Sequence, residues 1–221
     1  MTASPQAQSR KPRRKGALSP ERVLAAGFAL LILLGTALLC IPAVTADGKG
    51  LSFFDALFTA TSAVCVTGLV AVDTGTAFST LGQAILLLLV QVGGLGFMVF
   101  GTLILGLLGH RLSLRSRMLV RDSMSASSMS GLMRQTGVCC GVAFGCELLG
   151  AVLLSFRFVP LYGWGKGAWF SVFHAVSAFC NAGFDLFGGF SSLTGFWNDG
   201  WVLLVISLMI ILGGLGFFVI W

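Results

Sequence analysis

Charged residues are scarce in this chain of 221 residues, where Asp, Glu, Lys and Arg together make up only 10%. Soluble domains carry about 25% charged residues, so the composition argues against an ordinary soluble enzyme. Histidine occurs twice, and the six cysteines include no Cys-x-x-Cys pair. Because metal centres and most catalytic sites need such groups together, we expect no resident metal, no cofactor and no enzymatic activity.

Hydrophobic residues and glycine are abundant in this chain. Hydrophobic types make up 56% of the chain and glycine contributes 30 residues, about twice its average share of about 7%. The glycines stand among Leu, Val and Phe, without a collagen-like period. We therefore expect them to allow close packing or special backbone angles in an apolar medium. The composition indicates an all-α integral membrane protein.

Four apolar segments are each at least 19 residues long, namely 23–41, 81–108, 136–156 and 201–221. A helix of that length crosses the hydrocarbon layer of about 30 Å at about 1.5 Å per residue. The first segment also has the basic flank of a signal peptide. Its apolar run is longer than a typical signal core, and further segments follow, so a membrane span is favoured over cleavage.

Basic residues gather in two places. Of the 14 Lys and Arg residues, six precede residue 23 and five lie between Gly109 and Gln135, while the net charge is +6. Basic clusters beside apolar spans are typical of cytoplasmic segments, so we expect a multi-pass protein with its N-terminus inside and no nucleic-acid partner. The second cluster remains open to two interpretations, contact with anionic lipid or with a cytosolic subunit.

Two shorter apolar stretches, 53–64 and 169–179, have the length of re-entrant helices. Residues 58–69 match residues 173–184 at six of twelve positions, with an offset of 115. Residues 91–97 match residues 211–217 with an offset of 120. The order of the matches predicts two parallel repeats of transmembrane helix, re-entrant pore loop and transmembrane helix. The change of offset predicts a five-residue insertion in the second outer loop.

Irregular backbone at membrane depth is tolerated only where protein buries it or where it lines a water-filled path. A short helix followed by an extended segment with glycine offers backbone carbonyl groups that replace the hydration shell of a cation. A potassium-channel-like pore is therefore one interpretation of the two loops. The alternative is a non-conducting membrane assembly subunit whose re-entrant loops are structural plugs.

The segments at residues 54–69 (FDALFTATSAVCVTGL), 91–96 (QVGGLG) and 173–184 (FHAVSAFCNAGF) resemble the Trk/Ktr family of bacterial potassium-uptake proteins. The short N-terminus is most similar to the Ktr-type membrane subunit. The resemblance implies four such repeats around one pore, with one filter glycine from each. The chain ends at Trp221 inside the fourth apolar segment, so we expect it to be the N-terminal half of such a subunit.

The resemblance further implies a function, partners and a location. We expect uptake of K⁺, with Na⁺ as a candidate coupling ion, across the bacterial cytoplasmic membrane. The implied partners are the lipid bilayer, a second copy in a homodimer, and a cytosolic ring of nucleotide-binding regulatory (RCK-type) subunits. Residues expected to form the filter through their backbone are Cys65, Val66, Thr67 and Gly68 in the first repeat, and Cys180, Asn181, Ala182 and Gly183 in the second.

The predicted organisation has four parts. We expect a basic cytoplasmic tail over 1–21, the first repeat over 22–109, a basic cytoplasmic linker over 110–134, and the second, C-terminally truncated repeat over 135–221.

Three acidic residues deserve separate interpretations. Asp73 and Asp185 follow the two expected filter segments, where they would concentrate cations at the outer mouth or serve as solvated loop carboxylates. Glu147 is the one acid inside an apolar segment, which makes it a functional candidate. We favour a structural role for Glu147, as a hydrogen-bonded residue at an interface between helices.

His174 stands in the second re-entrant helix where the first repeat has Thr59. We expect a packing hydrogen bond there and not contact with an ion. The glycines of the two GGLG motifs, at 93, 94 and 96 and at 213, 214 and 216, are expected to let helices approach closely more than to act as hinges.

Overall fold

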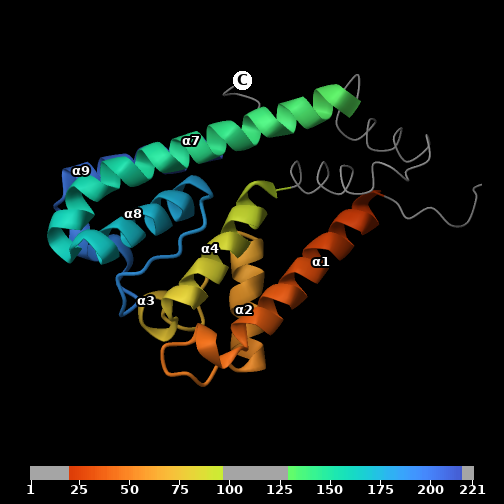
Figure 1. Cartoon of the computed structure of the whole chain (residues 1–221), viewed down its shortest axis with the longest axis horizontal. Coiled ribbons are helices and arrows are strands. Elements are labelled where there is room, and N and C mark those ends of the chain that lie inside the picture. The colour runs from red at the N-terminus through yellow and green to blue at the C-terminus, as the bar shows by residue number, and fades with distance from the viewer. Residues whose placement is uncertain (1–19, 97–128, 216–221) are drawn as a thin grey trace, which may run out of the picture.

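The computed structural model describes residues 20–96 and 129–215, which form helices joined by loops (Figure 1). Within these two ranges the sheet-like pairing is limited to one isolated antiparallel bridge between Thr45 and Phe78. The expected all-α class is confirmed for the described part of the chain.

The described helices fall into two groups. The first consists of α1 (Pro20–Leu39), η1 (Pro42–Val44), α2 (Phe53–Val64), α3 (Thr74–Ala77) and α4 (Thr80–Gly94). The second consists of α7 (Met129–Tyr162), α8 (Trp164–Phe179), η2 (Ser192–Phe196) and α9 (Gly200–Gly214). The short helix α2 packs against both α1 and α4, and α8 packs against both α7 and α9. Each group therefore holds one helix, α2 or α8, between two others.

Side-chain caps fix where α2, α3, α4 and α9 begin, and Asp73 is the cap of α3. The Ser52 hydroxyl accepts a hydrogen bond from the Asp55 N–H at 3.2 Å and donates to the Asp55 carboxylate at 2.7 Å, at the start of α2. Ser79 caps α4 and Asp199 caps α9, each accepting from the N–H three residues later. Such caps satisfy N–H groups that have no partner in the first turn.

The reversal from α7 into α8 needs a single residue, Gly163, whose φ of +80° is open mainly to glycine. Gly167 in the first turn of α8 then lies against the backbone of α7, where an added Cβ would come within 2.5 Å of the Phe158 carbonyl oxygen. The side chain of Phe158 is fully buried in the second group. This close hairpin places α8 along α7, as Figure 1 shows.

The observed helix bounds agree in part with the expected segments. Helix α2 has the expected range, 53–64, whereas α8 begins at Trp164, five residues before the expected 169. Helix α7 begins at Met129, inside the expected linker 110–134. The parts of the expected segments 81–108 and 201–221 that follow residues 96 and 215 lie outside the described residues, as does most of the expected tail 1–21.

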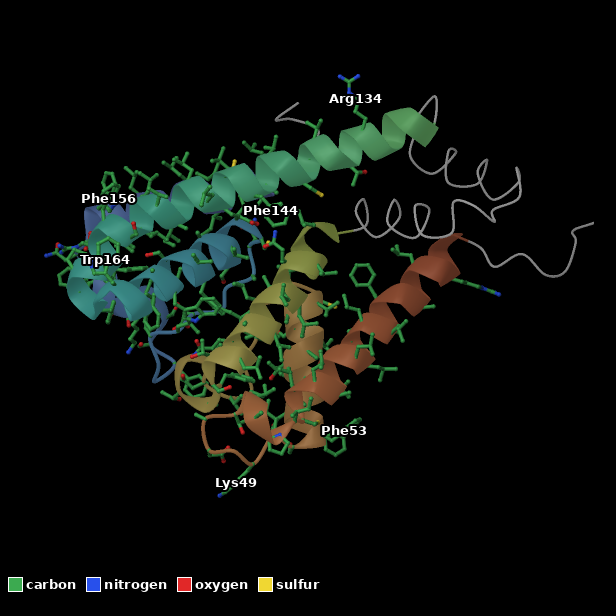
Figure 2. The ribbon with its side chains drawn as sticks, viewed as in Figure 1. Lys49, Phe53, Arg134, Phe144, Phe156 and Trp164 are labelled. Carbon is green, nitrogen blue, oxygen red and sulfur yellow. The ribbon has the colours of Figure 1, made fainter. Side chains whose placement is uncertain are left out.

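Among the described residues, one helical stretch, Thr136–Tyr162, is long and apolar enough to cross a bilayer, and four shorter apolar helices accompany it. Large apolar side chains on α7, including Phe144, Leu148 and Phe156, are more than half exposed. Figure 2 shows Lys49 and Arg134 projecting from opposite sides of the molecule. Such extensive exposed apolar surface suits lipid or a further partner.

Helix α4 joins the two groups. The side chain of Gln83 is buried, and its Oε1 accepts a hydrogen bond from the Trp169 indole N–H of α8 at 2.8 Å. The Gln83 amide also donates to the Phe78 carbonyl oxygen at 3.4 Å. A buried amide on an apolar helix is costly unless it is paired, so this residue favours the observed docking of α4 on α8.

The glycines at the two GGLG motifs permit equivalent close contacts. An added Cβ at Gly93 would collide with the carbonyl oxygen of Val64, the last residue of α2. An added Cβ at Gly213 would collide with that of Phe179, the last residue of α8. The packing role is confirmed at these two positions. For Gly96, which has a φ of +61° and no described neighbour within 4 Å, the packing role stays a prediction, because the residues after it lie outside the described part of the chain.

We predict that Gly93→Ala destabilises the protein, because the added methyl group must displace the backbone at the end of α2. Overpacking of this kind costs about 1–3 kcal/mol, which thermal unfolding in detergent would detect as a lower Tm. The matched control is Gly141→Ala in α7, where no described atom lies within 4 Å of the added carbon. Alanine is the better helix former by about 1 kcal/mol, so the control keeps or raises Tm. Equal effects of the two substitutions would contradict the packing role.

Candidate functional site

The segments that follow α2 and α8 form the candidate site. Each helix ends at a cysteine cap, Cys65 or Cys180, and the chain then continues without helical structure through Gly68 or Gly183. We call residues 65–68 the first segment and residues 180–183 the second segment. The C-terminal end of a helix carries a partial negative charge that favours a nearby cation, and both segments begin at such an end.

The two segments have the same backbone hydrogen bonds. The N–H groups of Cys65, Val66 and Thr67 donate to the carbonyl oxygens of Thr61, Ala63 and Ser62 at 2.8, 3.2 and 2.9 Å. Those of Cys180, Asn181 and Ala182 donate to Val176, Ala178 and Ser177 at 2.9, 3.0 and 2.7 Å. Every donor and acceptor in the second set lies 115 residues after its counterpart in the first. The backbone conformation thus follows the repeat found in the sequence.

Positive φ angles occur at matching positions in both segments. Val66 and Asn181 have φ of 56° and 57°, and Gly68 and Gly183 have φ of 73° and 75°. Such values are uncommon for residues other than glycine, above all for a β-branched valine. Conformations of this kind persist only where the surrounding structure enforces them, and they gather at functional sites.

Gly68 and Gly183 lie next to each other, so the structure brings the two predicted filter glycines together. An added Cβ at Gly68 would come within 2.5 Å of the Ala182 carbonyl oxygen and 3.3 Å of the Gly183 Cα. An added Cβ at Gly183 would lie 3.5 Å from the Gly68 Cα. Gly68 therefore has no room for a side chain on the side that faces the second segment, whereas an added Cβ at Gly183 would make an ordinary van der Waals contact.

Two buried serines, Ser62 and Ser177, tie the segments to their helices, and sequence reasoning missed both as site residues. The Thr67 hydroxyl donates to the Ser62 hydroxyl at 2.9 Å, and the Ser177 hydroxyl donates to the Phe184 carbonyl oxygen at 2.6 Å. The signal that could have found them was present, because serine is identical at this position in both repeats.

Further contacts hold the second segment. The His174 Nδ1 donates to the Phe170 carbonyl oxygen at 2.7 Å, and its Nε2 accepts from the Leu186 N–H at 3.3 Å. The Asn181 side chain donates to the Ile210 carbonyl oxygen of α9 at 3.4 Å. The expected packing role of His174 is confirmed, since both ring nitrogens bond to backbone groups and the residue is buried.

A cavity of about 170 Å³ lies beside the second segment, between α8 and α9. Its polar lining includes His174, Ser177, Asn181, Asp185 and Ser192. A water molecule occupies about 30 Å³ in the liquid, so the space accommodates a small number of waters next to the segment. Within the described ranges, no three His, Cys, Asp or Glu side chains gather as metal ligands.

Asp73 and Asp185 lie near each other after the two segments. The Asp185 Oδ1 accepts from the Phe187 N–H at 3.0 Å. Partial burial raises the pKa of Asp185, and the negative charge of Asp73 raises it further. At Asp73 burial also raises the pKa, but hydrogen bonds from the backbone of Phe190 and Thr76 outweigh that effect and the pKa is lowered. Asp73 therefore accepts more hydrogen bonds from the backbone than Asp185 does.

Glu147 lies where three helices meet. Its side chain is only 4% exposed, and its Oε1 accepts from the Gln91 side-chain amide of α4 at 2.8 Å. The Cys180 Sγ lies 3.9 Å from the same oxygen. An added Cβ at Gly94 would come within 2.5 Å of that sulfur. The structural interpretation of Glu147 as a hydrogen-bonded residue between helices is confirmed, and its neighbour is the first residue of the second segment.

The sequence of this chain is similar to that of known cation transport proteins. The TrkH family, described as cation transport protein, matches residues 11–221. The chain is 43% identical to the potassium/sodium uptake protein NtpJ of Enterococcus hirae over 209 residues, which cover 95% of this chain and 46% of that protein. It is 46% identical to the Ktr system potassium uptake protein B of Bacillus subtilis over 202 residues, covering 91% of this chain and 44% of that protein. A protein of the same description from Vibrio alginolyticus is 41% identical over 199 residues, covering 90% and 43%. The chain spans less than half the length of these relatives.

We predict that Glu147→Ala lowers stability while Glu147→Gln largely preserves it. The alanine variant leaves the partly buried Gln91 amide without its acceptor, which costs about 1–3 kcal/mol. Glutamine retains an oxygen in the same place. Thermal unfolding of the two variants in detergent, beside the wild-type protein, measures the difference. A glutamine variant as unstable as the alanine variant would show that the charge of Glu147, and not its acceptor oxygen, is what the structure requires.

Proposed function

Because the chain belongs to the TrkH family of cation transport proteins, we propose that it is part of a membrane protein that carries potassium ions past backbone carbonyl groups. The family confirms the resemblance expected from the sequence. Its description as cation transport protein, and the names of the relatives, support a transport protein and not an enzyme. The relatives that it matches are described as potassium or potassium/sodium uptake proteins. Their names support K⁺ as the transported ion.

The observation that carries the proposal is the matched pair of segments after α2 and α8. The same hydrogen bonds and the same positive φ angles recur 115 residues apart, which supports two parallel repeats of helix, pore loop and helix. In the proposed filter, the carbonyl oxygens of 65–68 and 180–183 replace part of the ion's hydration shell. Neutral carbonyl groups suit a large monovalent cation such as K⁺ before Na⁺.

The surroundings of the two segments support cation entry from the side of Asp73 and Asp185. Both carboxylates stand after the segments, so their charge raises the local concentration of cations at that mouth. In this proposal Asp185, with one hydrogen bond from the backbone, meets the ion more readily than Asp73 does. Sodium dependence of uptake is proposed as well, supported by the name of the Enterococcus relative.

The assembly and its place in the cell complete the proposal. We place the protein in the bacterial cytoplasmic membrane with its N-terminus inside, which the basic residues before residue 23 support. The pore requires further filter segments, supplied by the remainder of a longer polypeptide or by a second copy. A cytosolic ring of nucleotide-binding subunits is the proposed regulatory partner on the side of the basic stretch 110–134.

We predict that Gly68→Ser and Gly183→Ser weaken the preference for K⁺ over Na⁺. Serine resists a φ near +75°, and its Cβ at position 68 would meet the Ala182 carbonyl oxygen. A loss on the order of tenfold corresponds to about 1.4 kcal/mol between the two ions. Uptake of K⁺ in competition with Na⁺, measured in a K⁺-uptake-deficient strain expressing the transport-competent protein that contains this chain, gives the ratio.

The matched control for this experiment is Gly48→Ser. Gly48 lies in the loop before α2 with a φ of +71°, and no described atom lies within 4 Å of an added Cβ. It therefore carries the same backbone strain away from the proposed filter, and we expect its ion preference to be unchanged. Normal growth of both filter variants on low potassium, with normal ion preference, would contradict the proposed filter.

A second candidate function is a non-conducting subunit whose two segments act as structural plugs. The close contact between Gly68 and Ala182 favours this candidate, because packed segments leave little space for an ion between them. Reconstitution of the complete protein into vesicles separates the two functions. We predict K⁺ flux that the two filter substitutions alter, whereas a plug predicts no K⁺ flux in the wild-type protein.

A further inference from the structure

The loop after the second segment folds back onto the first group of helices. Alignment of the repeats makes this loop five residues longer than its counterpart after the first segment. Positive φ angles at Gly188, Gly189, Phe190 and Ser192, of 85°, 65°, 52° and 51°, curve it tightly. The added length thus forms a contact between the two groups, which the function of the filter does not by itself require.

Asp73 forms the hydrogen bond that holds this loop to the first group. Its Oδ2 accepts from the Phe190 N–H at 2.7 Å, across 117 residues of sequence, and its Oδ1 accepts from the Thr76 N–H of α3 at 3.0 Å. One carboxylate therefore joins the outer loop of the first group to that of the second. Hydrogen bonds to an ionised acceptor are about twice as strong as neutral ones.

The backbones of the two loops also touch around this carboxylate. An added Cβ at Gly75 would come within 2.5 Å of the Leu186 carbonyl oxygen, and one at Gly188 would lie 3.2 Å from the Thr76 Cγ2. The contact is close enough that a change at Asp73 cannot be absorbed by free space between the loops.

Asp73 follows Gly68 by five residues, and Phe190 follows Gly183 by seven. A bond between Asp73 and Phe190 therefore restrains the distance between the two segments at their outer ends. We propose that Asp73 is a positioning residue for ion selectivity: it clasps the second outer loop and thereby fixes the first and second segments relative to each other. The proposal rests on the proposed function, since it assigns a role within the same filter.

We call the bond between Asp73 and the Phe190 N–H the clasp. A positioning role through the clasp and a purely electrostatic role at the mouth predict different effects of losing Asp73. If Asp73 only concentrated cations, its loss would raise the K⁺ concentration needed for half-maximal uptake, and high ionic strength would remove the effect. If Asp73 holds the loops, its loss changes the ratio of K⁺ to Na⁺ uptake at every ionic strength. The two roles are separated by measuring both quantities.

The experiment compares Asp73→Ala, Asp73→Asn and the control Asp47→Ala in the transport-competent protein, reconstituted into vesicles. Asp47 lies in an outer loop of the first group, and its hydrogen bonds are local, to the Lys49 N–H at 3.1 Å and to the Thr45 side chain. Its removal takes away a charge without touching the clasp. We expect the K⁺ to Na⁺ ratio to fall by roughly tenfold in Asp73→Ala, as the loss of the charge-assisted hydrogen bond from the Phe190 N–H predicts. Asp73→Asn keeps an acceptor oxygen and a larger part of the ratio, and Asp47→Ala keeps all of it.

A covalent replacement provides the second test. The double substitution Thr76→Cys and Gly188→Cys, added to Asp73→Ala, places two thiols where the loops touch. We expect oxidation to restore the ratio and reduction to abolish it again. An unchanged ratio in Asp73→Ala, or equal losses in the alanine and asparagine variants that vanish in high salt, would overturn the clasp. Absence of K⁺ flux in the wild-type protein and in Asp47→Ala would instead refute the proposed function.

Discussion

The structure depends on one constraint, the need of backbone N–H groups to find acceptors where water is scarce. At the ends of α2 and α8 the helical pattern stops, yet the next three N–H groups bond back to carbonyl oxygens of the helix just completed. The chain can then leave each helix end without exposing unpaired donors to an apolar medium. This backbone path requires a positive φ at the second and fourth residues of each segment. Glycine at the fourth position, Gly68 or Gly183, lowers the conformational strain there.

The same constraint explains where other glycines are needed. The first segment begins at the end of α2 and the second at the end of α8. The helices that follow them, α4 and α9, pass close to these two helix ends. Gly93 of α4 and Gly213 of α9 lie against the last carbonyl groups of α2 and α8, where any side chain would separate the helices. Lipid offers no hydrophobic drive for helices to associate, so close packing of small residues carries that association. The GGLG motifs thus pack against the helix ends from which the two segments begin.

The sequence predicted the features that follow from repetition and missed those that depend on tertiary contacts. The all-α class, the range of α2 and the packing of Gly93 and Gly213 were predictable, because composition and the internal match carry them. The earlier start of α8 at Trp164 was not, because Gly163 permits a one-residue reversal that hydropathy does not register. Nor was the engagement of Asp73, since its partner is the backbone of a residue 117 positions away. Backbone donors have no sequence signature.

The two repeats keep the backbone path and differ in the side chains that anchor it. In the first, the hydroxyl of Thr59 is buried without a hydrogen-bond partner among the described residues. Its counterpart His174 bonds to Phe170 and to Leu186, which lies beyond the second segment. Asn181 adds a bond to α9, whereas Val66 at the equivalent position has no polar side chain. The second segment is therefore tied to its surroundings on more sides than the first. The clasp at Asp73 reaches from the less anchored repeat to the better anchored one, so the loop of the second repeat serves as a fixed reference for the first.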